Sequence, residues 1–249
     1  MNSRRSKQFR TVLYFVLLSV ISACGTTGKI SEGDPFENFN RGAFKFNQKM
    51  DKHIFNPIAE VYDDVLPEVV DEGISNFFSN VNDISVIAND ILQGKFAQAF
   101  SDLGRLILNS TLGLGGFFDV ATDAGLPKHR EDFGQTLGKW GFDSGPFIIV
   151  PFMGPTTVRA GIGLGVDTIG LNPFTYYPGE TVVNGGLMGV QYIDFKADLL
   201  STGELLGIAA VDEYGFLRSV YLQYRDHVTH DRTEDDLVEE DPDFDSFDE

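Results

Sequence analysis

The first half of the chain places apolar residues three or four positions apart, which is the spacing of a single helix face. The first such face is made by Phe36, Phe39, Ala43, Phe46 or Asn47, and Met50. Ahead of it, Asp34-Pro35-Phe36-Glu37 offers an acidic N-cap, a proline at the first helical position and an acid close behind, much like a capping box. The pattern predicts a helix that begins there, ends near Lys52 and carries an aromatic face.

The same spacing predicts five further helices. They run from Pro67 toward Asn80, from Ile84 to Leu92, from Phe96 to about Asn109, from Gly186 to about Leu200 and from Asp212 to about His227. Between Gly113 and Gly170 glycine is frequent and the spacing is lost, so only a short helix at 117–124 and an extended piece at 147–150 are predicted. Since the sequence has no alternating strand pattern, we expect an all-α fold with one short extended piece.

The first 24 residues have the layout of a lipoprotein signal peptide. Four basic residues precede an uncharged, mostly apolar run from Thr11 to Ile21, which is too short to span a bilayer. The only cysteine then follows in Ile21-Ser22-Ala23-Cys24, which resembles a lipobox. That resemblance implies cleavage before Cys24 and acylation of its thiol and new amino terminus, and Gly25 favours the outer membrane. The alternative is an ordinary secreted protein with an incidental cysteine.

The charge of the chain limits its possible partners and distinguishes the C-terminal tail from the helical domain. The net charge is −18 and becomes −22 when the four basic signal residues are removed, which excludes nucleic acid as a partner. Residues 231–249 hold eleven acids and one base, so we expect a disordered acidic tail that either solubilises the protein or docks a partner. The expected organisation is a signal peptide at 1–23, an anchor linker at 24–33, a helical domain at 34–230 and the tail.

Aromatic residues change this picture once the anchor is considered. The chain has 22 phenylalanines and one tryptophan. A globular core could hold many of them. Beside a lipid anchor, they also permit short helices that turn phenylalanine toward acyl chains and polar residues toward a protected interior. We favour this second arrangement.

A long series of motifs runs from Asp34 to Pro173. It includes Asp34-Pro35-Phe36-Glu37-Asn38-Phe39-Asn40-Arg41, Leu92-Gln93-Gly94-Lys95, Asn109-Ser110-Thr111-Leu112-Gly113, Glu131-Asp132-Phe133-Gly134-Gln135-Thr136-Leu137-Gly138, Trp140-Gly141 and Gly145-Pro146-Phe147, and it closes with Arg159, Asp167, Asn172 and Pro173. In these motifs the chain resembles the MlaA family, also called VacJ. The likeness is weak beyond Pro173, and Phe36, Asn38 and Asn82-Asp83 depart from the usual family residues.

The resemblance implies both a fold and a function. The implied fold is a ring of short amphipathic helices with Gly/Pro-rich connections, lying in the periplasmic leaflet of the outer membrane around an amphipathic channel. The implied function is removal of mislocalised phospholipid from the outer leaflet and its delivery to a periplasmic carrier, MlaC, which maintains lipid asymmetry. Family members commonly sit beside a trimeric porin.

Polar residues in the motifs are candidates for the headgroup path through such a channel. A headgroup that crosses hydrocarbon loses several kcal/mol of solvation, and a polar path removes much of that cost. The candidates are Arg41, Asn47, Asp51, Arg105, Asn109, Asp132, Gln135 and Arg159. The alternative for each is a structural hydrogen bond or ion pair that fastens helices together.

Two other functions remain open at this point. A phospholipase would need a nucleophile elbow, and Gly141-Phe142-Asp143-Ser144-Gly145 misses the G-x-S-x-G spacing by one residue, so we expect no enzyme. A structural envelope protein associated with a porin is the second. His227 and His230 could meet a metal, but they adjoin the expected tail and we expect solvated side chains. The glycines at 161, 163 and 165 lack the context of a nucleotide loop, so no cofactor is expected.

Overall fold

The computed structural model describes residues 33–176, 181–198 and 212–232, and within these ranges the chain is mostly helical. The prediction of an all-α fold is confirmed. The elements are α2 (Glu37–Met50), the π-helical turn η2 (Asp51–Phe55), α3 (Asn56–Val65), α4 (Glu68–Gln93), α5 (Phe96–Thr111), α6 (Val120–Asp123), α7 (Phe133–Lys139), β1 (Phe147–Val150), β2 (Gly154–Thr157), α8 (Val158–Val166), the π-helical turn η3 (Asp167–Leu171), α9 (Pro173–Tyr176), α10 (Thr181–Asp198) and α12 (Glu213–Thr229). The signal segment, Cys24 and the tail beyond Arg232 lie outside the described residues.

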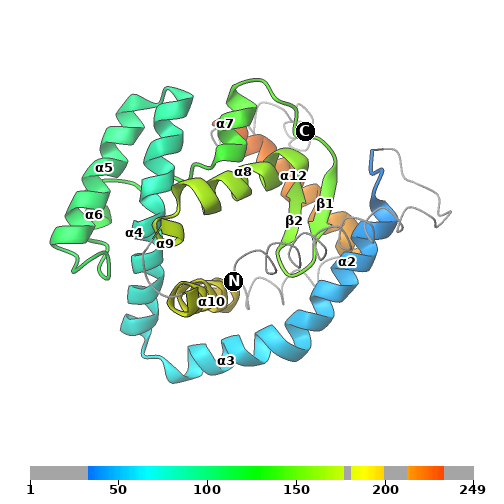
Figure 1. Ribbon diagram of the computed structural model, residues 1–249, viewed down its shortest axis with the longest axis horizontal. Helices are drawn as coiled ribbons and strands as arrows, with labels where there is room; N and C mark the ends of the chain where they lie inside the picture. The colour runs from blue at the N-terminus through cyan, green and yellow to red at the C-terminus, as the bar shows by residue number, and fades with distance from the viewer. Residues whose placement is uncertain (1–32, 177–180, 199–211, 233–249) are drawn as a thin grey trace, which may run out of the picture.

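The elements follow the outline of the molecule in Figure 1. There, α2, η2 and α3 form one curved arm that leads to α4. α4 packs against α5, and with α6 these helices make a lobe at one side. The antiparallel strands β1 and β2, with Phe147 opposite Thr157, lie beside α12 at the other side. α10 lies inside this outline and packs against α3 and α4. That these elements form a ring around a channel stays a prediction.

The curved arm continues past the point at which the sequence predicts its end. Pro57 has no N–H, and its ring would clash with the carbonyl of the residue four positions earlier in a regular α-helix. The π-helical turn η2 precedes this proline. In η2 the Asn56 N–H donates to the Asp51 carbonyl, one residue further back than in an α-helix. α3 then starts with the proline in its first turn, where the missing donor is tolerated.

α4 joins two helices that the sequence predicts as separate. The predicted break lies between Asn80 and Ile84, where apolar residues give way to Asn80, Asn82 and Asp83. Two of these polar residues face the interior: Asn80 donates to the Ser110 hydroxyl at 3.1 Å, and Asp83 pairs with Lys128. The helix therefore continues, because its inward face is polar at this level, and apolar spacing alone does not reveal that.

α5 begins at Phe96, as predicted, and has the predicted apolar face. Its apolar face, made by Phe96, Phe100, Leu103 and Ile107, is nevertheless exposed, and Phe100 is 75 % accessible. The opposite face is buried and carries Ala99, Asp102, Arg105 and Asn109. The helix is thus inverted relative to a surface helix of a water-soluble domain.

Three elements, α7, α8 and β2, lie where frequent glycine removes the apolar spacing from which helices and strands are predicted. α7 and α8 pack so closely that a Cβ on Gly163 would lie 2.2 Å from the Gly134 backbone nitrogen. Each helix has a side-chain N-cap instead of a long apolar face: Asp132 accepts from the Gln135 N–H, and Thr157 accepts from the Ala160 N–H. The same glycines that remove the apolar spacing allow the two helices to meet.

One small apolar cluster joins α2, β1 and α12. It contains Ala43, Phe147, Ile149 and Tyr214. Two asparagines of α2, seven positions apart, fasten the strand along this cluster. Asn40 donates to the Phe147 carbonyl and accepts from the Ile149 N–H, while Asn47 donates to the Val150 carbonyl and accepts from the Phe152 N–H. The amides thereby act as a partner strand for β1, with each backbone distance between 2.8 and 3.1 Å.

Candidate functional site

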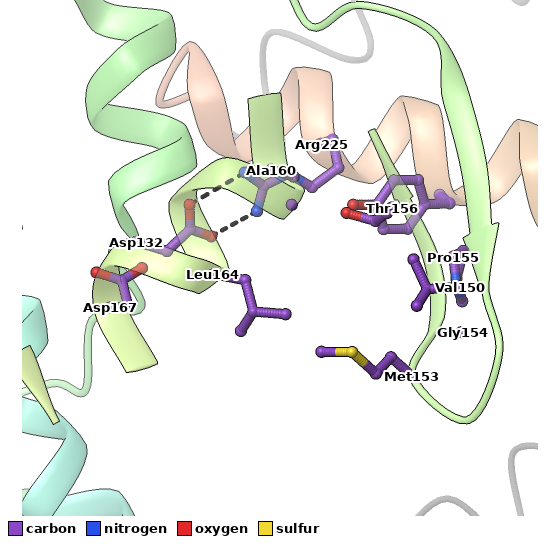
Figure 2. Close-up of a pocket in the computed structure, with 12 residues that line it drawn as sticks. Asp132, Val150, Met153, Gly154, Pro155, Thr156, Ala160, Leu164, Asp167 and Arg225 are labelled. Atoms are coloured by element: carbon purple, nitrogen blue, oxygen red, sulfur yellow. Dashed lines mark hydrogen bonds and ion pairs between the residues drawn. The ribbon is translucent and has the colours of Figure 1, made fainter. Parts of the chain in front are cut away.

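A cavity of about 280 Å³ lies between the strand hairpin, α8 and α12. Its apolar lining is formed by Val150, Met153 and Pro155 from the hairpin and by Ala160 and Leu164 from α8. In Figure 2, Met153 from the hairpin and Leu164 from α8 point toward each other across this space. The volume is close to the lower limit for small-molecule sites.

The cavity lining also contains a charged pair. The two terminal nitrogens of Arg225, on α12, lie 2.5 and 3.1 Å from the two carboxylate oxygens of Asp132, as the dashed lines in Figure 2 show. Burial alone would raise the pKa of Asp132, but the hydrogen bonds and charge of Arg225 outweigh it and hold this pKa below its usual value. Asp132 stays ionised, and Arg225 has a carboxylate for a partner.

Asp167, at the start of η3, also lines the cavity. It accepts hydrogen bonds from the Ser85 hydroxyl at 3.0 Å, the Asn89 amide at 3.0 Å and the Phe133 N–H at 2.9 Å. Burial raises the pKa of Asp167 in spite of these donors. The residue therefore ties α4, α7 and η3 together at the edge of the cavity.

Two predicted path residues, Gln135 and Arg159, lie next to the charged pair. Gln135 donates from its amide to the Arg130 carbonyl at 3.0 Å and to Asp132 at 3.3 Å. Arg159 donates to the Phe142 carbonyl at 2.7 Å and to the Thr229 hydroxyl at 3.0 Å. Burial, followed by repulsion from Arg225, lowers the pKa of Arg159. The structure thus brings Asp132, Gln135 and Arg159 together, and of these Asp132 lines the cavity.

Arg105 and Asn109 form a separate cluster in the α4–α5 lobe. Arg105 is 2 % exposed and donates to Asp119 at 2.8 Å and to the Thr122 hydroxyl at 3.0 Å. Asn109 donates to the other Asp119 oxygen at 2.9 Å. Although burial opposes it, donors from Thr122, Asn109 and Arg105 hold the pKa of Asp119 well below its usual range. This cluster fastens α5 to the connection that leads to α6.

The remaining three candidates lie on the curved arm. Arg41 pairs with Asp212 at 2.7 Å and with Glu37 at 2.8 Å, and this pairing lowers the pKa of Asp212 to about 2. Asp51 pairs with Lys196 of α10 at 2.6 Å. Asn47 holds the hairpin through Val150, which lines the cavity. All eight predicted path residues therefore have partners within the protein.

Among the described residues no group of three or more acidic, histidine or cysteine side chains is arranged to hold a metal ion. His230 instead lies 3.1 Å from a carboxylate oxygen of Asp226. None of the described helices combines the length and the hydropathy that crossing a bilayer requires.

Comparison with known proteins identifies the family. The family model for the MlaA lipoprotein matches residues 32–228. The chain belongs to the MlaA lipoprotein family. It is 33 % identical over 218 residues to the intermembrane phospholipid transport system lipoprotein MlaA of Escherichia coli K12, with 85 % of each chain covered. It is 31 % identical over 222 residues to the protein of the same name from Haemophilus influenzae, covering 84 % of this chain and 87 % of that one.

A solved structure from work on the structural basis for maintenance of bacterial outer membrane lipid asymmetry has the same fold. It matches with a TM-score of 0.69 and 33 % identity, over 79 % of this chain and 98 % of that chain. The predicted membership of the MlaA family is confirmed. The family match also runs well past Pro173, where the motifs become sparse, and it includes all of α12 except its last residue.

Sequence reasoning missed two charged residues of the cavity, Arg225 and Asp167. Asp167 belongs to the motif series but was not among the candidates for the path. Arg225 lies in the part of the chain where the resemblance is weak, although a local signal exists there. Leu217, Tyr221 and Arg225 follow one another at intervals of four on α12, so the arginine continues an inward face. A cation on such a face needs a partner, and that partner is Asp132.

Proposed function

We propose that this chain is an outer-membrane lipoprotein that removes mislocalised phospholipid from the outer leaflet and passes it to a periplasmic carrier. The inverted distribution of side chains carries this proposal. Among the described residues, 32 large apolar side chains are exposed, whereas nine apolar residues are buried. Seventeen polar or charged residues are buried. A monomeric protein in water rarely exposes apolar surface on this scale, so hydrocarbon is the natural surrounding for these faces.

The same distribution explains how a phospholipid could be handled. The exposed apolar faces of α3, α5, α8 and α10 would stay among acyl chains, since each carries at least three exposed apolar side chains. The cavity offers the charged groups of Asp132 and Arg225 together with the apolar side chains of Leu164 and Met153. A headgroup would find hydrogen-bonding partners there while its chains remain in oil. The path would run past Asp132, with the other seven candidates holding its walls in place.

Anchoring and partners complete the proposal. Acylation at Cys24 would hold the protein on the periplasmic side of the outer membrane, because several acyl chains anchor stably where one does not. A trimeric porin would lie beside it, and the carrier MlaC would accept the lipid on the periplasmic side. The relatives from E. coli and H. influenzae support the proposal, since both are named as lipoproteins of an intermembrane phospholipid transport system.

The decisive experiment follows labelled phospholipid from the reconstituted lipoprotein to its periplasmic carrier. We expect intact labelled lipid on the carrier, with none when the lipoprotein is left out. Release of fatty acid or lysolipid would instead indicate a phospholipase. In cells, deletion of the protein should raise surface phospholipid and detergent sensitivity, and a Cys24→Ala form should not restore the barrier. Normal surface lipid in the deletion strain would indicate a structural envelope protein.

A further inference from the structure

Arg225 is the positively charged residue that lines the cavity, and part of its hydrogen-bonding capacity is unused. The residue is 9 % exposed. Its two terminal nitrogens are engaged by Asp132, but its Nε–H is buried and has no acceptor among the described residues. A guanidinium is a planar fork whose donors match two oxygens of a phosphate as well as those of a carboxylate.

We propose that Arg225 binds the phosphate of a phospholipid in this cavity, and that Asp132 holds the guanidinium when no lipid is present. This inference rests on the proposed function and assigns its headgroup contact. The phosphate diester would replace the Asp132 carboxylate as the bidentate partner of Arg225. The phosphate is common to all phospholipids, so this contact would recognise the lipid class and not a particular headgroup.

The surroundings of Asp132 make such an exchange feasible. Asp132 is the N-cap of α7 and accepts from the Gln135 N–H at 2.8 Å and from the Gln135 side-chain amide at 3.3 Å. When Arg225 turns to a phosphate, the carboxylate keeps these two donors and is not left buried without a partner. The exchange is therefore reversible, as a transport step requires.

A second cation strengthens the attraction for an anion. Arg159 lies close enough to Arg225 for the two to repel, and repulsion from Arg225 contributes to the lowered pKa of Arg159. Arg159 is also attracted by the carboxylates of Asp132, Asp143 and Asp226, while its terminal nitrogens donate to the Phe142 carbonyl and the Thr229 hydroxyl. The other acid at the cavity, Asp167, is already held by three donors from α4 and α7. Arg159 thus places a second positive charge near a phosphate that Arg225 would hold.

The shape of the cavity selects a lipid over a free anion. Leu164 and Met153 form apolar parts of the cavity wall, as Figure 2 shows. Inorganic phosphate gains nothing from such a wall, whereas the glycerol and the first methylenes of a lipid chain bury apolar surface against it. A phosphate that carries two chains should therefore bind more tightly than phosphate alone.

The test measures binding of phosphatidylglycerol, diacylglycerol and inorganic phosphate to the full lipoprotein in detergent, by native mass spectrometry, for the wild type and three variants. Arg225→Gln should weaken phosphatidylglycerol binding about tenfold and leave diacylglycerol binding unchanged, since only the first ligand has a phosphate. Asp132→Asn should tighten phosphatidylglycerol binding and slow its transfer to the carrier. Arg218→Gln is the matched control on α12, because Arg218 donates to the Gly33 carbonyl and lies outside the cavity.

The outcomes separate this inference from the proposed function. If the wild type transfers phospholipid and Arg225→Gln binds it as well as Arg218→Gln does, the phosphate contact is wrong while the transport function stands. Equal loss of both ligands would mean that Arg225 only supports the fold. Inorganic phosphate that binds as tightly as the lipid would overturn the assignment to a headgroup.

If Arg225→Gln does not fold, Asp132→Asn decides, since unchanged phosphatidylglycerol binding in that variant contradicts the exchange. Absence of transfer by the wild type would refute the proposed function itself.

Discussion

The α4–α5 lobe and the α2–β1–α12 body are built on opposite rules. In the body, apolar residues such as Phe147 and Ile149 are buried and form a cluster, as in a water-soluble domain. In the lobe, the buried residues between the two helices are mostly polar, while Phe96 and Phe100 lie outside. Hydrogen bonds and ion pairs hold the lobe together where apolar packing holds the body. One chain thus satisfies two different surroundings, and substitutions should have opposite consequences in the two regions.

A large effect is expected in the lobe when the buried Arg105 is removed from its ion pair. Arg105→Met should lower the free energy of unfolding by about 3 kcal/mol, because it leaves Asp119 without its guanidinium and removes three buried donor contacts. Denaturant unfolding in detergent measures this. The matched control, Arg41→Met, removes an exposed ion pair to Asp212 and should change stability by no more than about 1 kcal/mol. Equal losses would show that the lobe does not depend on its buried polar contacts.

In the body, the corresponding substitution is in the apolar cluster. Ile149→Ala should lower the free energy of unfolding by about 2 to 4 kcal/mol, because Ile149 is 1 % exposed and its removal leaves a cavity against Ala43 and Phe147. Ile107→Ala, on the outer face of α5 and 54 % exposed, should change it by less than about 0.5 kcal/mol in the same detergent. A larger loss at Ile107 than at Ile149 would reverse the comparison drawn here.

The contrast also explains which parts of the fold the sequence predicts. Apolar spacing locates α5 and α12 because each has one continuous apolar or aromatic stripe, and it is indifferent to whether that stripe faces oil or the interior. The spacing fails in α4, where inward positions such as Asn80 and Asp83 are polar, and it fails in α7 and α8, where Gly134 and Gly163 replace large side chains at the contact. The physical signal that remains there is N-capping by Asp132 and Thr157.

The candidate site divides in the same way. Asp132 could be chosen from the sequence because it stands in the densest motif, directly ahead of a helix. Its partner Arg225 could not, because 93 positions separate the two residues and only the packing of α12 on α7 brings them together. Path and fastening residues use the same amino acids, so sequence does not separate Arg105, which fastens α5, from Asp132, which lines the cavity.

The outer face of α5 offers a direct test of its surroundings. Phe100→Glu, made in a Cys24→Ala background that lacks the anchor, should reduce binding to phospholipid vesicles at least tenfold. A carboxylate held in hydrocarbon costs about 2.5 to 3.5 kcal/mol, and Phe100 is 75 % exposed. Vesicle flotation measures the bound fraction, and Phe100→Leu is the control that keeps the face apolar. Equal binding of the Glu and Leu variants would place this face outside the membrane.

The smallest expected effect concerns a buried acid pair in the lobe. Asp90 of α4 is fully buried, and neither of its oxygens has a donor among the described residues. Asp102 of α5 lies within hydrogen-bond reach of it and is itself 3.0 Å from the Nδ1 atom of His129. Burial, then the hydrogen bond to Asp102 and repulsion from Asp102 and Glu131, raises the pKa of Asp90 to about 8, against a smaller opposing effect of Lys95. A proton on Asp90 thus holds the two carboxyl groups together.

This proton makes the stability of the lobe depend on pH. The folded chain keeps it to about pH 8, whereas the unfolded chain releases it near the usual pKa of 3.8, so the stabilisation is complete below pH 4 and is lost as pH rises toward 8. Between pH 7 and pH 9 the free energy of unfolding should fall by an amount on the order of 1 kcal/mol from this group. Asp90→Asn keeps the shape of the side chain and supplies a permanent donor to Asp102, so its unfolding curves at the two pH values should lie closer together than those of the wild type. A pH dependence that survives in Asp90→Asn would assign the proton to another group and leave α4 and α5 joined by their remaining hydrogen bonds alone.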